Sequence, residues 1–425
     1  MTDRQDNAGR NSPRLSLHVP EPRFRPGDTV DFSHIAVTEA GAQPRPDEAC
    51  EASETWPLCD DLIRVLGDDD HAHGPWNPRL SADKLRELLR LMALTRTFDN
   101  RMYRAQRQGK TSFYLKSSGE EATSVCAAQA LDFDDMIFPS YRQQGCMIAR
   151  GYPIVEMVNQ IYSNRADRLK GRQLPILYSA RSVNFFTISG NLGTQLPQAT
   201  GFAMASAMKH DSRIAASWVG EGASAEGDFH AALTFAAVYN APVVFNVVNN
   251  QWAISSFSGL AGGERSTFAA RAVGYGIAGL RVDGNDALAV YAAERWAADR
   301  ARSNKGPTLI EFFTYRAEGH STSDDPNAYR AKESEAWPLG DPILRLRDHL
   351  IAIREWSEER HAEMDRELDE EVREAQREAE KNGILGHGLH HPFHTMFEDV
   401  FEELPWHLEE QAAQAIRERQ IKWPE

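Results

Sequence analysis

Residues 214–255 read IAASWVGEGASAEGDFHAALTFAAVYNAPVVFNVVNNQWAIS, and this stretch decides the fold. Two apolar runs predict buried strands, and the small and apolar residues between them predict a helix over Glu226–Tyr239. The first strand leads into the turn Gly220-Glu221-Gly222, and the second ends in Asn249-Asn250. The segment is therefore a βαβ unit with polar residues at the carboxyl ends of both strands, where open α/β sheets bind ligands. The strands are expected over Ile214–Val219 and Val243–Val248.

A magnesium and diphosphate site is the interpretation that accounts for the whole motif. Gly220 and Gly222 let the backbone approach a ligand closely, and the N-terminus of the helix behind them favours an anion such as a diphosphate. The carboxylate of Glu221 would repel a diphosphate unless a cation lies between them. Magnesium fits, because it prefers oxygen ligands in octahedral geometry. The expected protein ligands are the Glu221 carboxylate, the Asn250 amide oxygen and the Trp252 carbonyl.

Two other interpretations explain less of the motif. Gly220-x-Gly222-x-x-Ala225 fits a loose dinucleotide-binding fingerprint, but that pattern expects an acidic residue at the end of the second strand, where this chain has asparagines. The fingerprint also gives no reason for a carboxylate between the glycines. A purely structural glycine turn explains each piece alone but not the set.

The rest of the chain extends the alternation of strands and helices. Apolar runs at Met136–Pro139 and Thr308–Phe313 predict two more strands, and helices are expected at Pro197–Met208 and Asp286–Ala301. This order predicts an α/β fold in which a parallel sheet has helices on both faces. We divide the chain into an extended N-terminal arm, the α/β domain, and a helical C-terminal region with a partner-docking tail. The parts span residues 1–75, 76–335 and 336–425.

The two ends of the chain differ from the domain in composition. The arm is rich in Pro, Asp, Glu and Arg, which fits either disorder or an extended segment around a neighbouring subunit, and LHVPEP (Leu17–Pro22) favours ordered contact. A helix is expected to begin near Ser81. Arg354–Lys381 is dense in Glu and Arg and predicts a solvated surface helix with internal ion pairs. Met396–Leu408 carries more apolar side chains than a free tail exposes, so we expect it to dock on this subunit or on a partner.

Charge and composition restrict the classes of partner. The chain has 425 residues and a formal net charge of -15, which argues against nucleic acid as the main partner. Its four cysteines form no Cys-x-x-Cys pair, so we expect reduced thiols rather than a zinc or redox site. The polar start, Met1–Arg14, has no apolar signal region, and no apolar run is long enough to span a bilayer. We therefore expect a cytoplasmic protein that does not associate with membranes.

The Gly-Glu-Gly motif, followed after 26 residues by Asn-Asn, resembles the thiamine diphosphate signature Gly-Asp-Gly…Asn-Asn. Glutamate in place of aspartate is similar to the branched-chain 2-oxo acid dehydrogenases, and specifically to the alpha subunits of their decarboxylating component, 2-oxoisovalerate dehydrogenase. The resemblance covers roughly Trp76–Trp406 and rests on separated blocks. They are TSFYLKSSGEEA (Thr111–Ala122), FPSYRQQG (Phe138–Gly145), FFTISGNLGTQLPQATG (Phe185–Gly201) and YRAEGHSTSDDPNAYR (Tyr315–Arg330).

The resemblance implies a thiamine diphosphate-binding fold and gives roles to residues in these blocks. Arg142 would bond diphosphate oxygens as a planar fork. His320 matches the active-site histidine that contacts the diphosphate and faces the acyl group, although without the resemblance a surface role would be preferred for it. His320 and Tyr141 are the candidate catalytic residues, and Phe113 and Tyr141 the candidate substrate contacts. The implied cofactor contacts are Tyr141, Arg142, Gly190, Leu192, Gly220, Glu221, Gly222, Ala223, Asn250, Trp252, Ile254 and His320.

Two features of related proteins have partial counterparts here. In some family members the loop that matches Phe185–Gly201 binds potassium, but Gly190 and Asn191 depart from the Ser-Pro of those members. Ser321 falls where mammalian relatives are phosphorylated, and a phosphate there would repel the cofactor and the substrate carboxylate. The candidate potassium ligands are Ser189, Asn191, Thr194 and Gln195.

The resemblance also implies a reaction and its partners. Decarboxylation of a 2-oxo acid needs a cofactor as electron sink, and thiamine diphosphate supplies it. Its activation needs a carboxylate that, in two-subunit members, belongs to the beta subunit. The chain is thus expected to form an α2β2 heterotetramer, to oxidatively decarboxylate branched-chain 2-oxo acids, and to pass the acyl group to the lipoyl domain of an acyltransferase core that binds it through a subunit-binding domain. The alternatives are a pyruvate or acetoin dehydrogenase alpha subunit and, from another class, a non-catalytic α/β scaffold.

Overall fold

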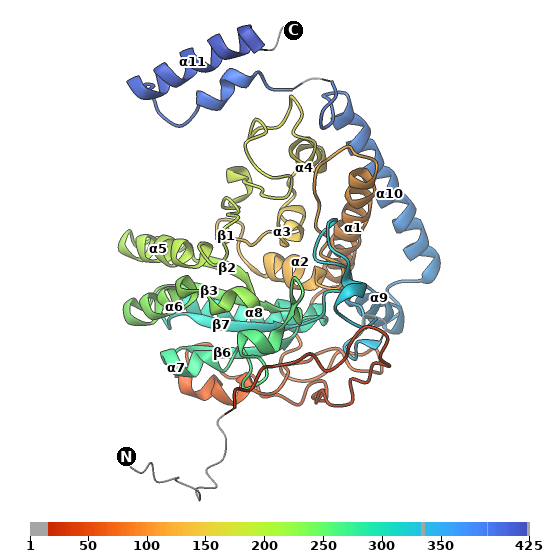
Figure 1. The fold of residues 1–425 in the computed structure, drawn as a ribbon. Coiled ribbons are helices and arrows are strands. Elements are labelled where there is room, and N and C mark those ends of the chain that lie inside the picture. Colours follow the sequence, from red (N-terminus) through yellow and green to blue (C-terminus); the bar gives the residue numbers. More distant parts are fainter. Residues whose placement is uncertain (1–15, 333–335, 389, 423–425) are drawn as a thin grey trace, which may run out of the picture.

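A five-stranded parallel sheet in the order β1-β2-β3-β7-β6 forms the centre of the protein (Figure 1). The structure is a computed structural model, and it describes residues 16–332, 336–388 and 390–422. Four of these strands are predicted from the sequence within one residue at each end, whereas β6 is not. The strands are β1 (Met136–Phe138), β2 (Ala215–Gly220), β3 (Val243–Asn249), β6 (Ala278–Asp283) and β7 (Thr308–Phe313).

Alternate residues of each strand face opposite helical layers, as the period of two in a strand requires. On β3, Val244 and Val248 belong to the core shared with α2 (Glu121–Ala130) and α8 (Ala287–Arg302). Val243, Phe245 and Val247 pack in the second core, with the helices of the other face. Those helices are α5 (Gln195–Met208), α6 (Gly227–Tyr239) and α7 (Arg271–Tyr275). The predicted α/β class, with helices on both faces of a parallel sheet, is confirmed.

Further helices pack beside the α2 layer and complete the first core. The longest is α1 (Ala82–Arg107), whose cap Ser81 accepts a hydrogen bond from the Lys84 amide, so the predicted start near Ser81 is confirmed. The others are α3 (Gln144–Ala149), α4 (Ile154–Ile161), α9 (Pro342–Ala352) and α10 (Glu358–Glu380). In the described ranges, every helix is too short or too polar to cross a bilayer.

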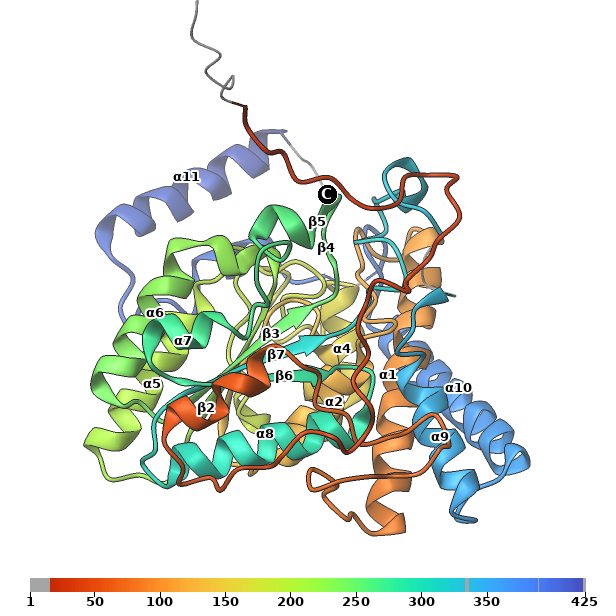
Figure 2. The same ribbon diagram turned by 90° about the horizontal axis from the view of Figure 1, so that it is seen from below.

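Residues 16–75 run along the outside of this same chain in extended form (Figure 2). Their one regular element is a short 3-10 helix, Ala52–Cys59. After it, Ile63 pairs with Val282 at the free edge of β6, and the Val65 and Leu66 amides donate to the buried Asp286 carboxylate at 2.7 and 2.6 Å. The described part of the arm is therefore in ordered contact with its own chain, and contact with a neighbouring subunit stays a prediction.

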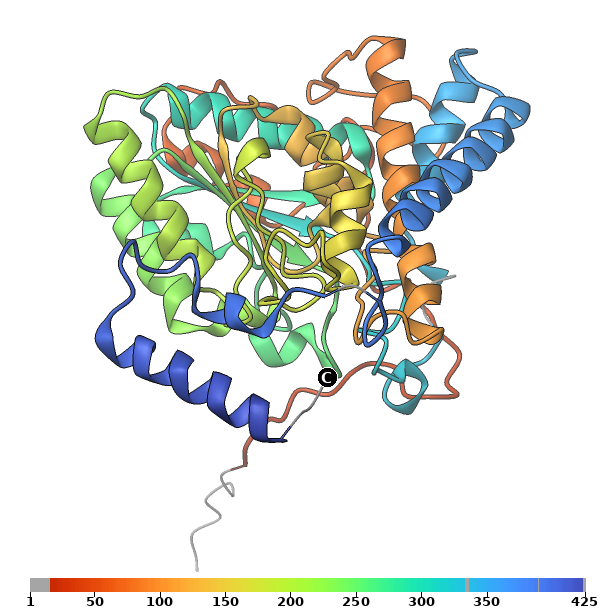
Figure 3. The same ribbon diagram turned by 90° about the horizontal axis from the view of Figure 1, so that it is seen from above.

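In the C-terminal region, α9 and α10 pack on the domain, and the last helix lies apart from it (Figure 3). The α10 helix packs on α1 and buries Met364, Leu368 and Val372, while its charged residues form ion pairs, as predicted for a surface helix. The last helix, α11 (Trp406–Lys422), lies away from the sheet.

Ion pairs join the tail before α11 to the domain. Lys170 pairs with Glu398 at 2.7 Å, and Arg172 pairs with Asp399 at 3.0 Å. In contrast, Phe401 is 52% exposed and Trp406 is 71% exposed. The most exposed apolar side chains of the predicted docking tail are thus not buried on this chain, and docking on a partner stays a prediction.

Candidate active site

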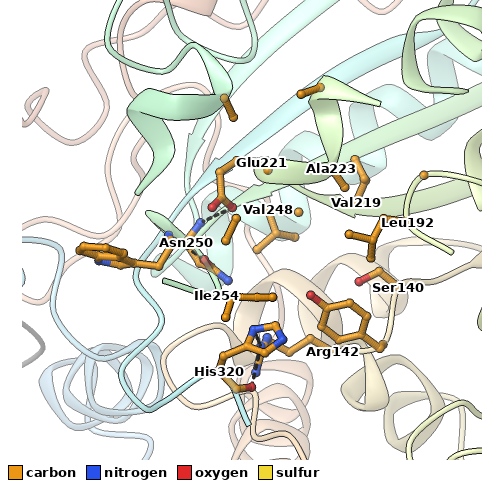
Figure 4. A pocket seen from close by; sticks show the side chains of 18 of the residues that line it. Ser140, Arg142, Leu192, Val219, Glu221, Ala223, Val248, Asn250, Ile254 and His320 are labelled. Carbon is orange, nitrogen blue, oxygen red and sulfur yellow. Dashed lines mark hydrogen bonds between the residues drawn. The ribbon is translucent and has the colours of Figure 1, made fainter. Parts of the chain in front are cut away.

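A cavity of about 470 Å³ lies at the carboxyl ends of β1, β2 and β3. It collects most of the residues that the sequence suggests, although they are spread over 180 positions (Figure 4). Phe113 and Thr194 are absent from its lining. Phe113 is partly buried and packs against the core, and its role as a substrate contact stays a prediction. The suggested residues that line it are Tyr141, Arg142, Ser189, Gly190, Asn191, Leu192, Gln195, Gly220, Glu221, Gly222, Ala223, Asn250, Trp252, Ile254 and His320.

The glycine turn after β2 differs in one respect from the expectation. The strand continues through Gly220, and a 3-10 turn, Gly222–Ala225, separates it from α6, so the α-helix does not begin directly behind the glycines. The extended conformation of Glu226 causes the separation. A Cβ on Gly222 would lie 2.4 Å from the Ala253 Cβ, whereas a Cβ on Gly220 would meet nothing within 4 Å. Gly222 therefore permits close packing, and Gly220 leaves space in the cavity.

Glu221 has the environment expected of a cation ligand. Its side chain is 1% exposed, and Oε2 accepts a long hydrogen bond, 3.4 Å, from the backbone N–H of Asn250. Oε1 is buried and has no hydrogen-bond partner among the described residues. Burial, and next the nearby Glu120 carboxylate, raise the pKa of Glu221 to about 7. A buried carboxylate oxygen without a partner is costly, and a bound cation removes that cost.

The other two suggested magnesium ligands lie directly after β3. The Asn250 Oδ1 accepts from the Trp252 amide at 3.2 Å, which closes a tight loop. The Trp252 carbonyl has a partner that the sequence did not suggest, because it accepts from Arg316 Nη1 at 2.7 Å. A carbonyl has two lone pairs, so one remains for a metal. The Glu221, Asn250 and Trp252 oxygens therefore fit a hard cation such as magnesium.

Arg142 and His320 face these oxygens from the opposite side of the cavity (Figure 4). Arg142 Nη2 donates to the His320 carbonyl at 3.1 Å and contacts His320 Nδ1 at 3.3 Å. Burial, and next the charges of Arg142 and Arg316, lower the pKa of His320 to about 3. The imidazole is therefore neutral near pH 7, and since Nδ1 accepts from Arg142, Nε2 carries the proton. The ring of Tyr141 packs edge-on against this imidazole, with centroids 5.8 Å apart.

The loop that carries the candidate potassium ligands is closed by its own hydrogen bonds. The Ser189 hydroxyl accepts from the Asn191 amide at 3.1 Å, and Thr194 Oγ1 donates to the Asn191 carbonyl at 3.1 Å. Gln195 Nε2 donates to the Trp218 carbonyl at 2.7 Å. These bonds hold Gly190 and Leu192 at the cavity wall, and potassium binding stays a prediction.

Two charged residues of the site, Glu120 and Arg316, are missed by the sequence reasoning. Glu120 lines the cavity, is 2% exposed, and accepts from Asn250 Nδ2 at 2.8 Å. Arg316 is 1% exposed and donates to the Ile254 carbonyl at 2.9 Å, which holds Ile254 at a φ of 54°. A left-handed conformation is strained for a β-branched residue. Glu120 lies in the block Thr111–Ala122, and Arg316 lies in the block Tyr315–Arg330. In the sequence, the acidic pair Glu120-Glu121 before a run of small residues is the signal that points to Glu120.

Gly119, which precedes Glu120, is expected to be intolerant of substitution. Its φ is +91°, and an added Cβ would lie 2.4 Å from the Tyr315 carbonyl oxygen. We expect Gly119→Ala to lower the free energy of unfolding by about 1–3 kcal/mol or more, since left-handed strain adds to a backbone clash. Gly227→Ala is the control, because a Cβ there meets nothing within 4 Å. Urea denaturation compares them, and equal stability of both variants would contradict the role given to this turn.

Comparison with known proteins decides the family. The family model described as "Dehydrogenase E1 component" matches residues 89–387. The chain belongs to the dehydrogenase E1 component family. A second model, described as "2-oxoisovalerate dehydrogenase E1 alpha subunit N terminal", matches residues 13–53 of this E1 chain.

Individual relatives of this E1 chain are similar over most of its length. The 2-oxoisovalerate dehydrogenase subunit alpha of Pseudomonas aeruginosa is 59% identical over 348 residues, which cover 82% of this chain and 85% of that one. The mitochondrial subunit alpha of Homo sapiens is 43% identical over 291 residues, 67% of this chain and 64% of that one. Subunit alpha 1 of Arabidopsis thaliana is 41% identical over 322 residues, 75% of this chain and 66% of that one. The chain thus spans about two thirds of the human and plant relatives.

Proposed function

We propose that the chain is the alpha subunit of a thiamine diphosphate-dependent dehydrogenase that oxidatively decarboxylates branched-chain 2-oxo acids. One observation carries the proposal: the buried Glu221 carboxylate, with an unpartnered oxygen, lies at the strand ends opposite Arg142. That arrangement suits a cation bridging to a diphosphate. The 2-oxoisovalerate dehydrogenase alpha subunits among the relatives support the substrate class.

The cavity residues divide the binding of the cofactor among them. Glu221, Asn250 and Trp252 would hold magnesium, Arg142 would bind diphosphate oxygens, and Gly190 and Leu192 would form the wall beside the aminopyrimidine. Thiamine diphosphate supplies the electron sink for decarboxylation when bound. His320 would offer its Nε2–H as a neutral donor toward the acyl oxygen, and Tyr141 would hold the imidazole ring in place.

A second chain is needed to complete this site. Among the residues that line the cavity, the carboxylates are Glu120 and Glu221, both beside Asn250, so the carboxylate that activates the aminopyrimidine would come from a beta subunit. Leu192 and Ile254 line the cavity yet are 47% and 56% exposed, which suits coverage by a partner. We propose an α2β2 heterotetramer in which the apolar tail also docks on a partner, with transfer of the acyl group to a lipoyl domain of an acyltransferase core. A cytoplasmic location is part of the same proposal.

Steady-state kinetics of the chain co-expressed with its beta subunit test the substrate class. We expect kcat/KM for 3-methyl-2-oxobutanoate to exceed that for pyruvate by about 10- to 200-fold per methylene that the pocket recognises. A matched measurement with 2-oxobutanoate places the unbranched chain between them. Equal or greater kcat/KM for pyruvate would contradict the branched-chain assignment and favour a pyruvate dehydrogenase.

A further inference from the structure

Glu120 connects the residues proposed for the metal with those proposed for the diphosphate. Its Oε1 accepts from Asn250 Nδ2 at 2.8 Å and lies 3.6 Å from Arg142 Nε. The carboxylate is held by its turn, in which the Glu120 amide donates to the Ser117 carbonyl at 2.9 Å and Gly119 admits no side chain. A buried group on so fixed a base is suited to orienting its neighbours.

The orientation of the Asn250 amide decides whether it can bind a cation. An asparagine side chain has an oxygen end that accepts and a nitrogen end that donates, and only the oxygen can ligate magnesium. A carboxylate accepts but does not donate, so Glu120 can hold only the nitrogen end. The oxygen end is then turned toward the loop of Trp252, whose amide it accepts at 3.2 Å. Without Glu120, a rotated amide would point its N–H groups at the cation.

We propose that Glu120 is a positioning residue that fixes Asn250 as an oxygen ligand. The inference rests on the proposed function. The charge of the Glu120 carboxylate also has two opposite effects at the site. A carboxylate next to the cavity attracts a metal ion and repels a diphosphate that has no metal. Glu120 therefore favours the magnesium complex of the cofactor over the free diphosphate.

The test uses the α–β complex and two titrations by calorimetry. In Glu120→Ala, magnesium should bind about 10- to 100-fold more weakly in the presence of thiamine diphosphate, the range for loss of an outer partner of a metal ligand. Metal-free inorganic pyrophosphate should bind at least as tightly as in the unaltered complex. Glu120→Gln keeps an acceptor for the Asn250 amide, so it should recover most of the magnesium affinity. If Glu120→Ala does not fold, Glu120→Leu replaces it, since leucine fills the volume without an acceptor.

Glu294→Gln is the matched control, because Glu294 is a buried carboxyl on α8 that does not line the cavity. It should leave both affinities unchanged. Loss of pyrophosphate and magnesium affinity by the same factor in Glu120→Ala would indicate general damage and overturn the inference, as would equal magnesium affinity in Glu120→Ala and Glu120→Gln. If the unaltered complex shows no magnesium-dependent thiamine diphosphate binding, the proposed function itself fails.

Discussion

Replacing Glu221 with glutamine or alanine is expected to abolish magnesium-dependent binding of thiamine diphosphate. The carboxylate is the one charged ligand proposed for the cation, and its Oε1 has no other partner among the described residues. The loss should exceed the roughly 10- to 100-fold that removal of an outer partner costs. The metal-free protein should be as stable as before or more stable, because a buried carboxylate with an unpaired oxygen is unfavourable.

Thermal unfolding of the α–β complex separates these two effects. With magnesium and cofactor at about 100 times their Kd, the unaltered complex should gain about 2.7 kcal/mol of stability, and the Glu221→Gln complex should gain none. Glu294→Gln is the control, since Glu294 is a buried carboxyl on α8 outside the cavity and its pKa is raised to about 8 by burial. Normal ligand-induced stabilisation of Glu221→Gln would show that Glu221 does not bind the metal.

His320→Ala is expected to lower kcat by about 10²–10³-fold, the cost of losing one hydrogen-bond donor to developing charge. The neutral imidazole offers Nε2–H because Nδ1 accepts from Arg142. His320→Gln retains an N–H donor and should recover part of the loss. His349→Gln is the control, because His349 lies on α9 outside the cavity, where its ring hydrogen-bonds to the Asp70 carbonyl. Stopped-flow decarboxylation measures the effect, and an unchanged kcat in His320→Ala would remove His320 from the reaction.

The pH dependence of this histidine has a defined sign. Its pKa is lowered to about 3, below the usual value of 6.5, so the unfolded chain binds the proton first as the pH falls. His320 therefore contributes no pH dependence to stability above pH 6.5 and progressively favours unfolding as the pH falls from 6.5 toward 3.

The sequence predicts the βαβ unit closely because each of its elements is marked locally. Continuous apolar runs define β2 and β3, and β7 is predicted with its observed bounds. The strand β6 escapes notice because AGLRVD includes a charged Arg281, whose guanidinium stacks 4.6 Å from the Phe313 ring instead of facing solvent. Local pattern does not reveal such a long-range contact.

The site residues also divide into those that a short segment of sequence indicates and those that only a long-range contact brings to the site. Glu221 and Asn250 are predicted from the chemistry of one short segment, whereas Arg316 at the Trp252 carbonyl joins residues 64 positions apart. Phe113 packs against the core beside the site residues, so its role as a substrate contact stays a prediction. Helix α10 is recognisable from the sequence because its charged residues pair with one another on the helix surface.

Reconstitution of the enzyme from separately purified chains tests the central claim most directly. The claim is that this chain supplies the metal–diphosphate part of a site shared with a beta subunit. We expect no decarboxylation of 3-methyl-2-oxobutanoate by this chain with magnesium and thiamine diphosphate, and full activity when the beta chain is added in equal amount. Full activity of this chain alone would contradict the shared site.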